Sequence, residues 1–293
     1  MSASVSKGGT PYYYVPGPSR HPMMAATGLF FVALGAGQWV NGASWGPYSV
    51  ALGIVWWLVV LKQWFGDAIR ESESGQYSDN IDVSFRWSMA WFIFSEVMFF
   101  LAFFGALFYA RVVSVPWLDG ASNNAMTAEI LWPDFEAAWP LLKTPGGTET
   151  QAMPWSGIPL VNTLILLASS VTLQVAHVAI EQGRRMRLKV FLAITVLLGA
   201  VFLFLQGYEY MHAYQDLGLR LDSGVYGNTF YLLTGFHGLH VTIGAILLLV
   251  MLLRIVIKDH FTAERHFGFQ AAAWYWHFVD VVWLNLFIFV YVL

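Results

Sequence analysis

The sequence predicts an all-α polytopic membrane protein with seven transmembrane helices. Three observations lead to this fold class. Only 11% of the 293 residues are charged, whereas soluble domains carry about 25%. Hydrophobic residues make up 57% of the chain, and the mean hydropathy is +0.57. Lysine and arginine are also distributed unevenly between the segments that separate the apolar stretches.

Seven segments are long and apolar enough to cross a bilayer, which takes about 20 mostly apolar residues. They are Met23–Val40, Pro47–Phe65, Phe85–Val113, Pro159–Gln182, Leu188–Tyr210, Thr229–Ile257 and Gln270–Leu293. Proline opens the second and the fourth, a position that suits the first turn of a helix. The first 20 residues lack the apolar core of a signal peptide, so we expect the first apolar segment to direct insertion.

Lysine and arginine predict the orientation, because they concentrate in loops on the inner side of a membrane. With the N-terminus inside, the inner side carries Lys7, Arg20, Lys62, Arg70, Arg86, Arg184, Arg185, Arg187, Lys189, Arg254, Lys258 and Arg265. The outer side carries Arg111, Lys143 and Arg220. An odd number of spans places the C-terminus outside.

The chain is expected to divide into three parts. Residues 1–65 form an N-terminal tail and two helices, residues 66–84 an inner linker, and residues 85–293 a five-helix bundle. The outer loop 114–157 within this bundle is acidic and rich in proline and tryptophan. It is either a structured cap that could dock a partner or an ordinary solvated loop.

The composition excludes several classes of site. No cysteine is present, so disulfides, thiolate metal sites and iron–sulfur clusters are excluded. The net charge of −3 offers no basic excess, and we therefore expect no nucleic-acid partner.

Glu96 is an ionisable residue inside the third apolar segment. Its helical neighbours include Phe92, Phe99, Phe100 and Phe103, an apolar face that favours a neutral, protonated carboxyl group. An intramembrane carboxyl group indicates a functional site by default. The alternative is a protonated glutamate that only packs against a neighbouring helix.

Histidines within the apolar segments raise the question of haem ligation. His237 and His240 lie one turn apart on one helix, so they cannot ligate one haem from opposite sides. We therefore expect His177, His237, His240 and His277 to form hydrogen bonds between helices and to bind no metal. Asp280 lies three residues after His277, so the two can bond each other or a shared partner helix.

Polar residues at the inner ends of two segments could meet lipid headgroups. Asp67, Arg70 and Glu71 share a helix face close to tryptophan, and Arg254 lies at the inner end of the sixth segment. Either arginine could bind a lipid phosphate, or both could be ordinary solvated helix ends.

Two other functional classes remain open from the residues alone. A proton-coupled transporter could use Glu96 and Asp280, although no pair of helices interrupted by glycine or proline is evident. A di-haem membrane cytochrome would use the histidines.

Several long strings resemble one known family. They are DSGVYGNTF at 222–230, TGFHGLHV at 234–241 and HFGFQAAAWYWHFVDVVWL at 266–284, together with SEVMFF and DAIRES. In these strings, and over nearly its whole length, the chain resembles subunit III of the haem–copper cytochrome c oxidases. The resemblance implies a bundle in which two helices are separated from five by a V-shaped cleft that holds phospholipid.

The resemblance also implies a function. The chain would be an accessory, non-catalytic subunit of a proton-pumping oxidase that passes electrons from cytochrome c to dioxygen. Haems and copper would lie in partner subunits, with subunit I as the main contact and subunit II in the complex. The chain would stabilise subunit I, bind structural phospholipid and support proton uptake. Glu96 matches the family's helix-three glutamate, and Arg70 and Arg254 match its lipid-contacting arginines. A bacterial plasma membrane is expected ahead of the mitochondrial inner membrane.

Overall fold

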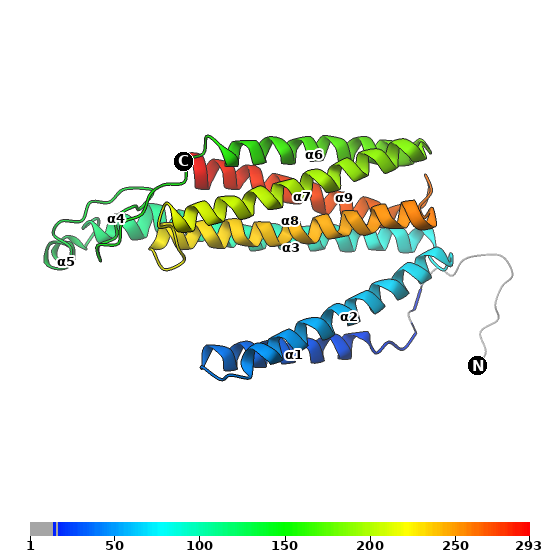
Figure 1. Cartoon of the computed structure of the whole chain (residues 1–293), viewed down its shortest axis with the longest axis horizontal. Helices are drawn as coiled ribbons and strands as arrows, with labels where there is room; N and C mark the ends of the chain where they lie inside the picture. Colours follow the sequence, from blue (N-terminus) through cyan, green and yellow to red (C-terminus); the bar gives the residue numbers. More distant parts are fainter. Residues whose placement is uncertain (1–13, 16) are drawn as a thin grey trace. The chain divides into compact units, whose positions relative to one another are not determined.

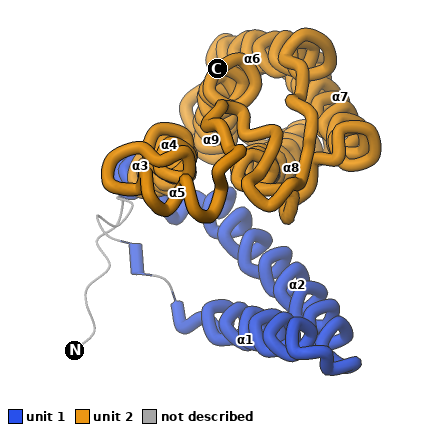
Figure 2. The backbone as a smooth tube through the Cα atoms, turned by 90° about the vertical axis from the view of Figure 1, so that its left-hand side faces the viewer, with its two compact units in different colours: residues 1–87 blue, residues 88–293 orange. Residues whose placement is uncertain are grey.

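The computed structural model describes residues 14, 15 and 17–293, so Lys7 and most of the predicted tail lie outside the described residues. It divides into two compact units, residues 1–87 and 88–293 (Figure 2). The described residues form seven helices long and apolar enough to cross a membrane, and they contain no strand beyond one isolated bridge. The prediction of an all-α polytopic protein is confirmed. The two-plus-five helix arrangement stays a prediction.

The first unit contains a close-packed helical hairpin of α1 (His21–Val40) and α2 (Gly46–Glu73). Glycines permit this contact. A Cβ atom on Gly35 would lie 2.6 Å from the backbone nitrogen of Val50, and one on Gly53 would lie 2.7 Å from that of Val32. Small residues let helix backbones approach in this way within membranes, where van der Waals packing replaces the hydrophobic effect.

The segment expected as an inner linker, residues 66–84, is mostly helical. The helix α2 continues to Glu73, and α3 (Asp79–Tyr109) begins after a short turn. Tyr77 in this turn donates a hydrogen bond to Glu71 Oε2 at 3.1 Å. Burial of the phenol is the main cause that raises the pKa of Tyr77 above its usual value, and the contact with Glu71 is the second. The helices extend past their apolar parts because polar pairs stabilise their ends.

The second unit is built on a ring of four long helices, seen end-on in Figure 2 and from the side in Figure 1. These are α6 (Ile158–Glu181), α7 (Arg185–Gln215), α8 (Val225–Lys258) and α9 (Phe267–Leu286), the last continued by the π-helical turn η2 (Phe287–Val292). Helix α6 contacts α7 and α9, and α8 contacts the same two helices. Basic residues gather where α6 and α8 end and where α7 and α9 begin, and this end of the unit is called the inner end below.

Buried tryptophans of α9 hold the four helices α6, α7, α8 and α9 together. Trp276 and Trp283 are 0% and 1% exposed, and their indole N–H groups donate to Ser169 and Thr163 of α6, each at 2.9 Å. Trp276 fits because Gly199 of α7 lies beside it, where an added Cβ would come within 2.6 Å of the ring. Each indole thus combines a large apolar contact with a satisfied donor.

Helix α3 packs on this ring through aromatic side chains. Phe92 stacks on Tyr275 of α9, with 6.1 Å between ring centroids, and Phe99 meets Phe236 of α8 edge to face at 5.2 Å. The opposite side of α3 exposes Trp91, Leu101 and Phe108. An apolar face of this kind suits lipid chains or a neighbouring membrane subunit.

The outer loop 114–157 is a packed cap. From α3 the chain continues through the π-helical turn η1 (Ala110–Ser114) and α4 (Val115–Leu118) to α5 (Ala125–Leu131). Leu141 and Met153 are buried, and the Met153 N–H donates to the hydroxyl of Tyr226 at the start of α8 at 3.2 Å. Of the two interpretations left open by the sequence, these contacts favour a structured cap.

We predict that Gly35→Ala destabilises the α1–α2 hairpin, because the new methyl group would meet the backbone of α2 at 2.6 to 2.8 Å. Overpacking of this kind costs about 1–3 kcal/mol. SDS-induced unfolding in mixed micelles, followed by tryptophan fluorescence, measures the change. Gly37→Ala is the matched control, since an added Cβ there meets no atom of the described residues within 4 Å. Equal stability of the two variants would contradict the packing described here.

Candidate functional site

The structure brings Glu96 of α3 against His240 of α8. Glu96 Oε2 lies 2.9 Å from His240 Nε2, and the side chains are 22% and 11% exposed. Aromatic rings enclose the pair: the rings of Phe100, Phe99 and Tyr275 lie 5.0, 5.9 and 6.3 Å from the imidazole. The expected interaction of Glu96 with a polar group on a neighbouring helix therefore has a defined partner.

The second nitrogen of His240 decides how protons are arranged in this pair. His240 Nδ1 lies 2.7 Å from the carbonyl oxygen of Phe236, which can only accept, so Nδ1 carries a hydrogen. A neutral imidazole then presents a lone pair at Nε2, and Glu96 must donate from a protonated carboxyl group. The alternative is an imidazolium beside a carboxylate. Both arrangements have zero net charge, as an apolar enclosure requires. We expect the first, called the neutral pair below, because burial among aromatic rings disfavours the two charged forms.

Of the other predicted intramembrane polar residues, His237 and His277 bond across helices. His177 Nε2 and both carboxylate oxygens of Asp280 have no hydrogen-bond partner among the described residues, so the interhelical bonds expected of them are not formed. His237, 1% exposed, donates from Nε2 to the carbonyl oxygen of Val279 on α9 at 3.2 Å. His277 Nδ1 lies 2.7 Å from Ser170 Oγ of α6 and 3.8 Å from Asp280 Oδ2. The Nε2 atom of His237 bonds Val279, and the Nε2 atom of His240 bonds Glu96. Both nitrogens are therefore occupied, and neither histidine fits ligation of a haem iron.

Asp67 and Arg70 lie together at the end of α2 in the first unit. Asp67 Oδ2 bonds His21 Nε2 of α1 at 2.6 Å, and its other oxygen pairs with Arg70. The Arg70 side chain is 74% exposed. Arg254 is half-buried, with its guanidinium 4.2 Å from the ring centroid of Phe261 and Nε 3.3 Å from His260 Nδ1.

Sequence reasoning missed one buried carboxyl group. Glu209 of α7 is 1% exposed and accepts a hydrogen bond from the Tyr291 hydroxyl at 2.6 Å. It lies inside the predicted segment Leu188–Tyr210, so the criterion that selected Glu96 also applied to it.

Comparison with known proteins decides the family. The family model for cytochrome c oxidase subunit III matches residues 11–293. The chain belongs to this family. Proteins named cytochrome c oxidase subunit 3 from Gadus morhua, Oncorhynchus mykiss and Formosania lacustris are 42%, 41% and 40% identical to it over 280 residues. Each match covers 95% of this chain and 96% of the relative.

Membership of the subunit III family makes this chain a multi-pass membrane subunit of the cytochrome c oxidase complex, a haem–copper oxidoreductase that acts in aerobic respiration. It also removes the transporter and the di-haem cytochrome as functional classes. The resemblance drawn from the sequence strings is confirmed.

We predict that Glu96→Gln keeps stability within about 0.5 kcal/mol of the wild type, because the amide N–H can donate to His240 Nε2 as a protonated carboxyl group does. Glu96→Leu leaves the buried acceptor unpaired and should cost about 1–3 kcal/mol. Unfolding of the assembled oxidase measures both variants.

Infrared spectroscopy provides an independent check on the same pair. The wild type should show the C=O stretch of a protonated carboxyl group that Glu96→Gln removes. An unchanged spectrum, or a Glu96→Gln variant as unstable as Glu96→Leu, would contradict the neutral pair.

Proposed function

We propose that this chain is an accessory subunit without a redox centre, which stabilises subunit I, binds structural phospholipid and supports proton uptake. The observation that carries the proposal is the pairing of its intramembrane polar groups across helices. Glu96 bonds His240, His237 bonds Val279, and His277 bonds Ser170. These bonds connect α3, α6, α8 and α9, and such connections suit a subunit with a structural role.

Electron transfer then belongs to partner polypeptides. Subunits I and II would hold the haems and copper, and cytochrome c would deliver electrons to the complex. Subunit I is the proposed main contact, and the exposed apolar faces of the helices supply area for such a partner. In the first three candidate spans only 11% of the most apolar window is buried within the chain, against 56% in the last. Lipid and neighbouring subunits must cover the remainder.

Arg70 is the first candidate for binding a lipid phosphate. Its guanidinium is 74% exposed although it pairs with Asp67, so N–H donors remain for a second anion. Trp64 lies on the same helix and stacks on His21 at 5.7 Å, an arrangement typical of the membrane interface. Arg254 is the second candidate, and its contact with Phe261 holds its guanidinium close to the protein.

The proposed orientation follows the lysines and arginines, with the N-terminus on the inner side and the C-terminus on the outer side. The bacterial plasma membrane, favoured by the sequence alone, gains no support from the relatives, which come from fish. We therefore place the chain in the mitochondrial inner membrane.

We predict that depleting this chain from the purified oxidase leaves the haem and copper absorption per catalytic subunit unchanged. Proton uptake into subunit I should become slower, because the inner-side entrance loses part of its wall. Optical spectroscopy and flow-flash measurement of proton uptake test the two statements. The proposal would be overturned if the haem or copper signal fell in proportion to the amount of this chain removed. A Soret band from the isolated chain would overturn it as well.

We also predict that Arg70→Gln lowers the phospholipid retained by the detergent-purified oxidase, because the headgroup phosphate loses a charge-assisted partner. Mass spectrometry of extracted lipid measures this amount. Lys143→Gln is the matched control: its side chain is 69% exposed, like that of Arg70, but it lies in the outer loop. If both variants retain the wild-type amount of lipid, Arg70 is not the lipid-binding residue.

A further inference from the structure

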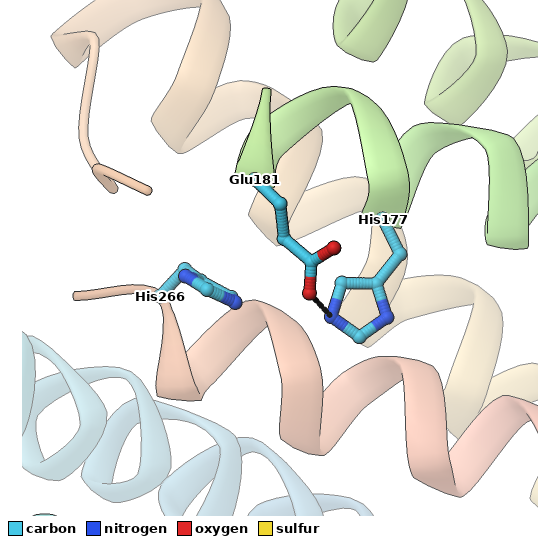
Figure 3. Close-up of side chains that lie close together, drawn as sticks. All are labelled: His177, Glu181 and His266. Carbon is cyan, nitrogen blue, oxygen red and sulfur yellow. Dashed lines mark ion pairs between the residues drawn. The ribbon is translucent and has the colours of Figure 1, made fainter. Parts of the chain in front are cut away.

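Three potential metal ligands converge at the inner end of the second unit. His177 and Glu181 lie on the last turns of α6, and His266 directly precedes α9 (Figure 3). One ligand atom from each residue lies within 4.8 Å of the others. His177 Nε2 is 3.9 Å from Glu181 Oε1, and the two imidazole rings stand 5.8 Å apart at 74°. Tertiary structure creates this cluster, because the sequence offers only the His177–Glu181 spacing on one helix.

The hydrogen bonds around these residues leave imidazole nitrogens available to ligate a metal. His266 Nδ1 lies 3.1 Å from the carbonyl oxygen of Thr262, so Nδ1 carries the hydrogen and Nε2 keeps its lone pair. This second contact also orients the ring, as outer partners commonly do for metal-binding histidines. His177 Nε2 is buried and has no hydrogen-bond partner among the described residues. Its 3.9 Å separation from Glu181 is too long for a hydrogen bond.

We propose that His177, Glu181 and His266 form a binding site for a divalent transition-metal ion, with zinc as the best match. Two imidazoles and one carboxylate are a known three-ligand set for zinc, with a fourth position left for water. Zinc–nitrogen bonds of about 2.0–2.1 Å place tetrahedral ligand atoms about 3.3 Å apart. The present separations therefore need to shorten by about 1.5 Å or less. Imidazole ligands disfavour magnesium and calcium.

The surroundings allow an ion to enter and hold the ligands in place. The Glu181 side chain is 56% exposed, which opens the site to the inner aqueous phase. Arg185 donates to the carbonyl oxygens of His260 and Phe261 at 3.1 and 2.6 Å. These bonds fix the segment between α8 and α9 to the start of α7, close in sequence to His266. A bound ion would join the end of α6 to the start of α9.

This site is separate from the Glu96–His240 pair and does not depend on the proposed accessory function. The sequence alone predicts no metal in the chain, so the proposal departs from that expectation. It concerns a divalent ion held at the inner end and leaves the haem and copper centres of the complex unaffected.

Equilibrium dialysis of the assembled oxidase against zinc tests the proposal. The complex is first washed with chelator, and bound zinc is compared between wild type and the variants His177→Gln, Glu181→Gln and His266→Gln. The wild type should bind one zinc ion more per complex than each variant, with affinity reduced by at least about 100-fold in each variant. X-ray absorption of the zinc-loaded wild type should show two imidazole ligands, and His177→Gln and His266→Gln should each lack this two-imidazole signal.

His212→Gln is the matched control. His212 of α7 and Asp216, which directly follows the helix, have the same four-residue spacing, with 2.7 Å between Nδ1 and Oδ2, but no third ligand joins them among the described residues. This variant should bind zinc like the wild type. Unchanged zinc binding in the three site variants, or an equal loss in His212→Gln, would overturn the proposal. Because Glu181 is exposed, Glu181→Gln serves as the decisive variant if His177→Gln reduces assembly.

Discussion

The fold depends on the requirement that the ionisable groups Glu96 and His240, placed within the membrane, find partners inside the protein. An unpaired polar group in hydrocarbon costs several kcal/mol, and water is not available there to replace a missing partner. Glu96 meets this requirement through His240, and His240 meets it through Glu96 and the carbonyl of Phe236. The pair fixes α3 beside α8 at one depth and rotation. Aromatic packing supplies contact area but is less directional.

The seven spans were predictable because hydrophobic length follows directly from composition. Their ends were not, because polar residues such as Asp67 and Glu71 extend α2 past the apolar segment through local pairs with Arg70 and Tyr77. The partner of Glu96 was not predictable either. His240 lies 144 positions away, and nothing in a single sequence specifies which of several intramembrane histidines faces which helix. Strings such as WYWHFVD are specific enough to indicate the family without knowledge of any contact.

The same reasoning separates three kinds of polar site in this chain. The buried pair Glu209–Tyr291 contributes to a scaffold, since its hydrogen bond joins α7 to η2. Arg70 combines an internal partner with high exposure, which suits an external anion. His177 has a buried nitrogen without a partner among the described residues, beside two further potential metal ligands, which suits a cation. Burial and pairing, more than residue type, distinguish these roles.

The most direct test of the central claim is an electron cryo-microscopy map of the assembled oxidase that resolves individual side chains. The account predicts continuous density between the Glu96 carboxyl group and the His240 ring at hydrogen-bond distance, with His237 against the backbone of α9. It also predicts that every haem iron and copper ion has its ligands in other subunits. Iron or copper bound to His237 or His240, or a Glu96 side chain turned toward lipid, would contradict it.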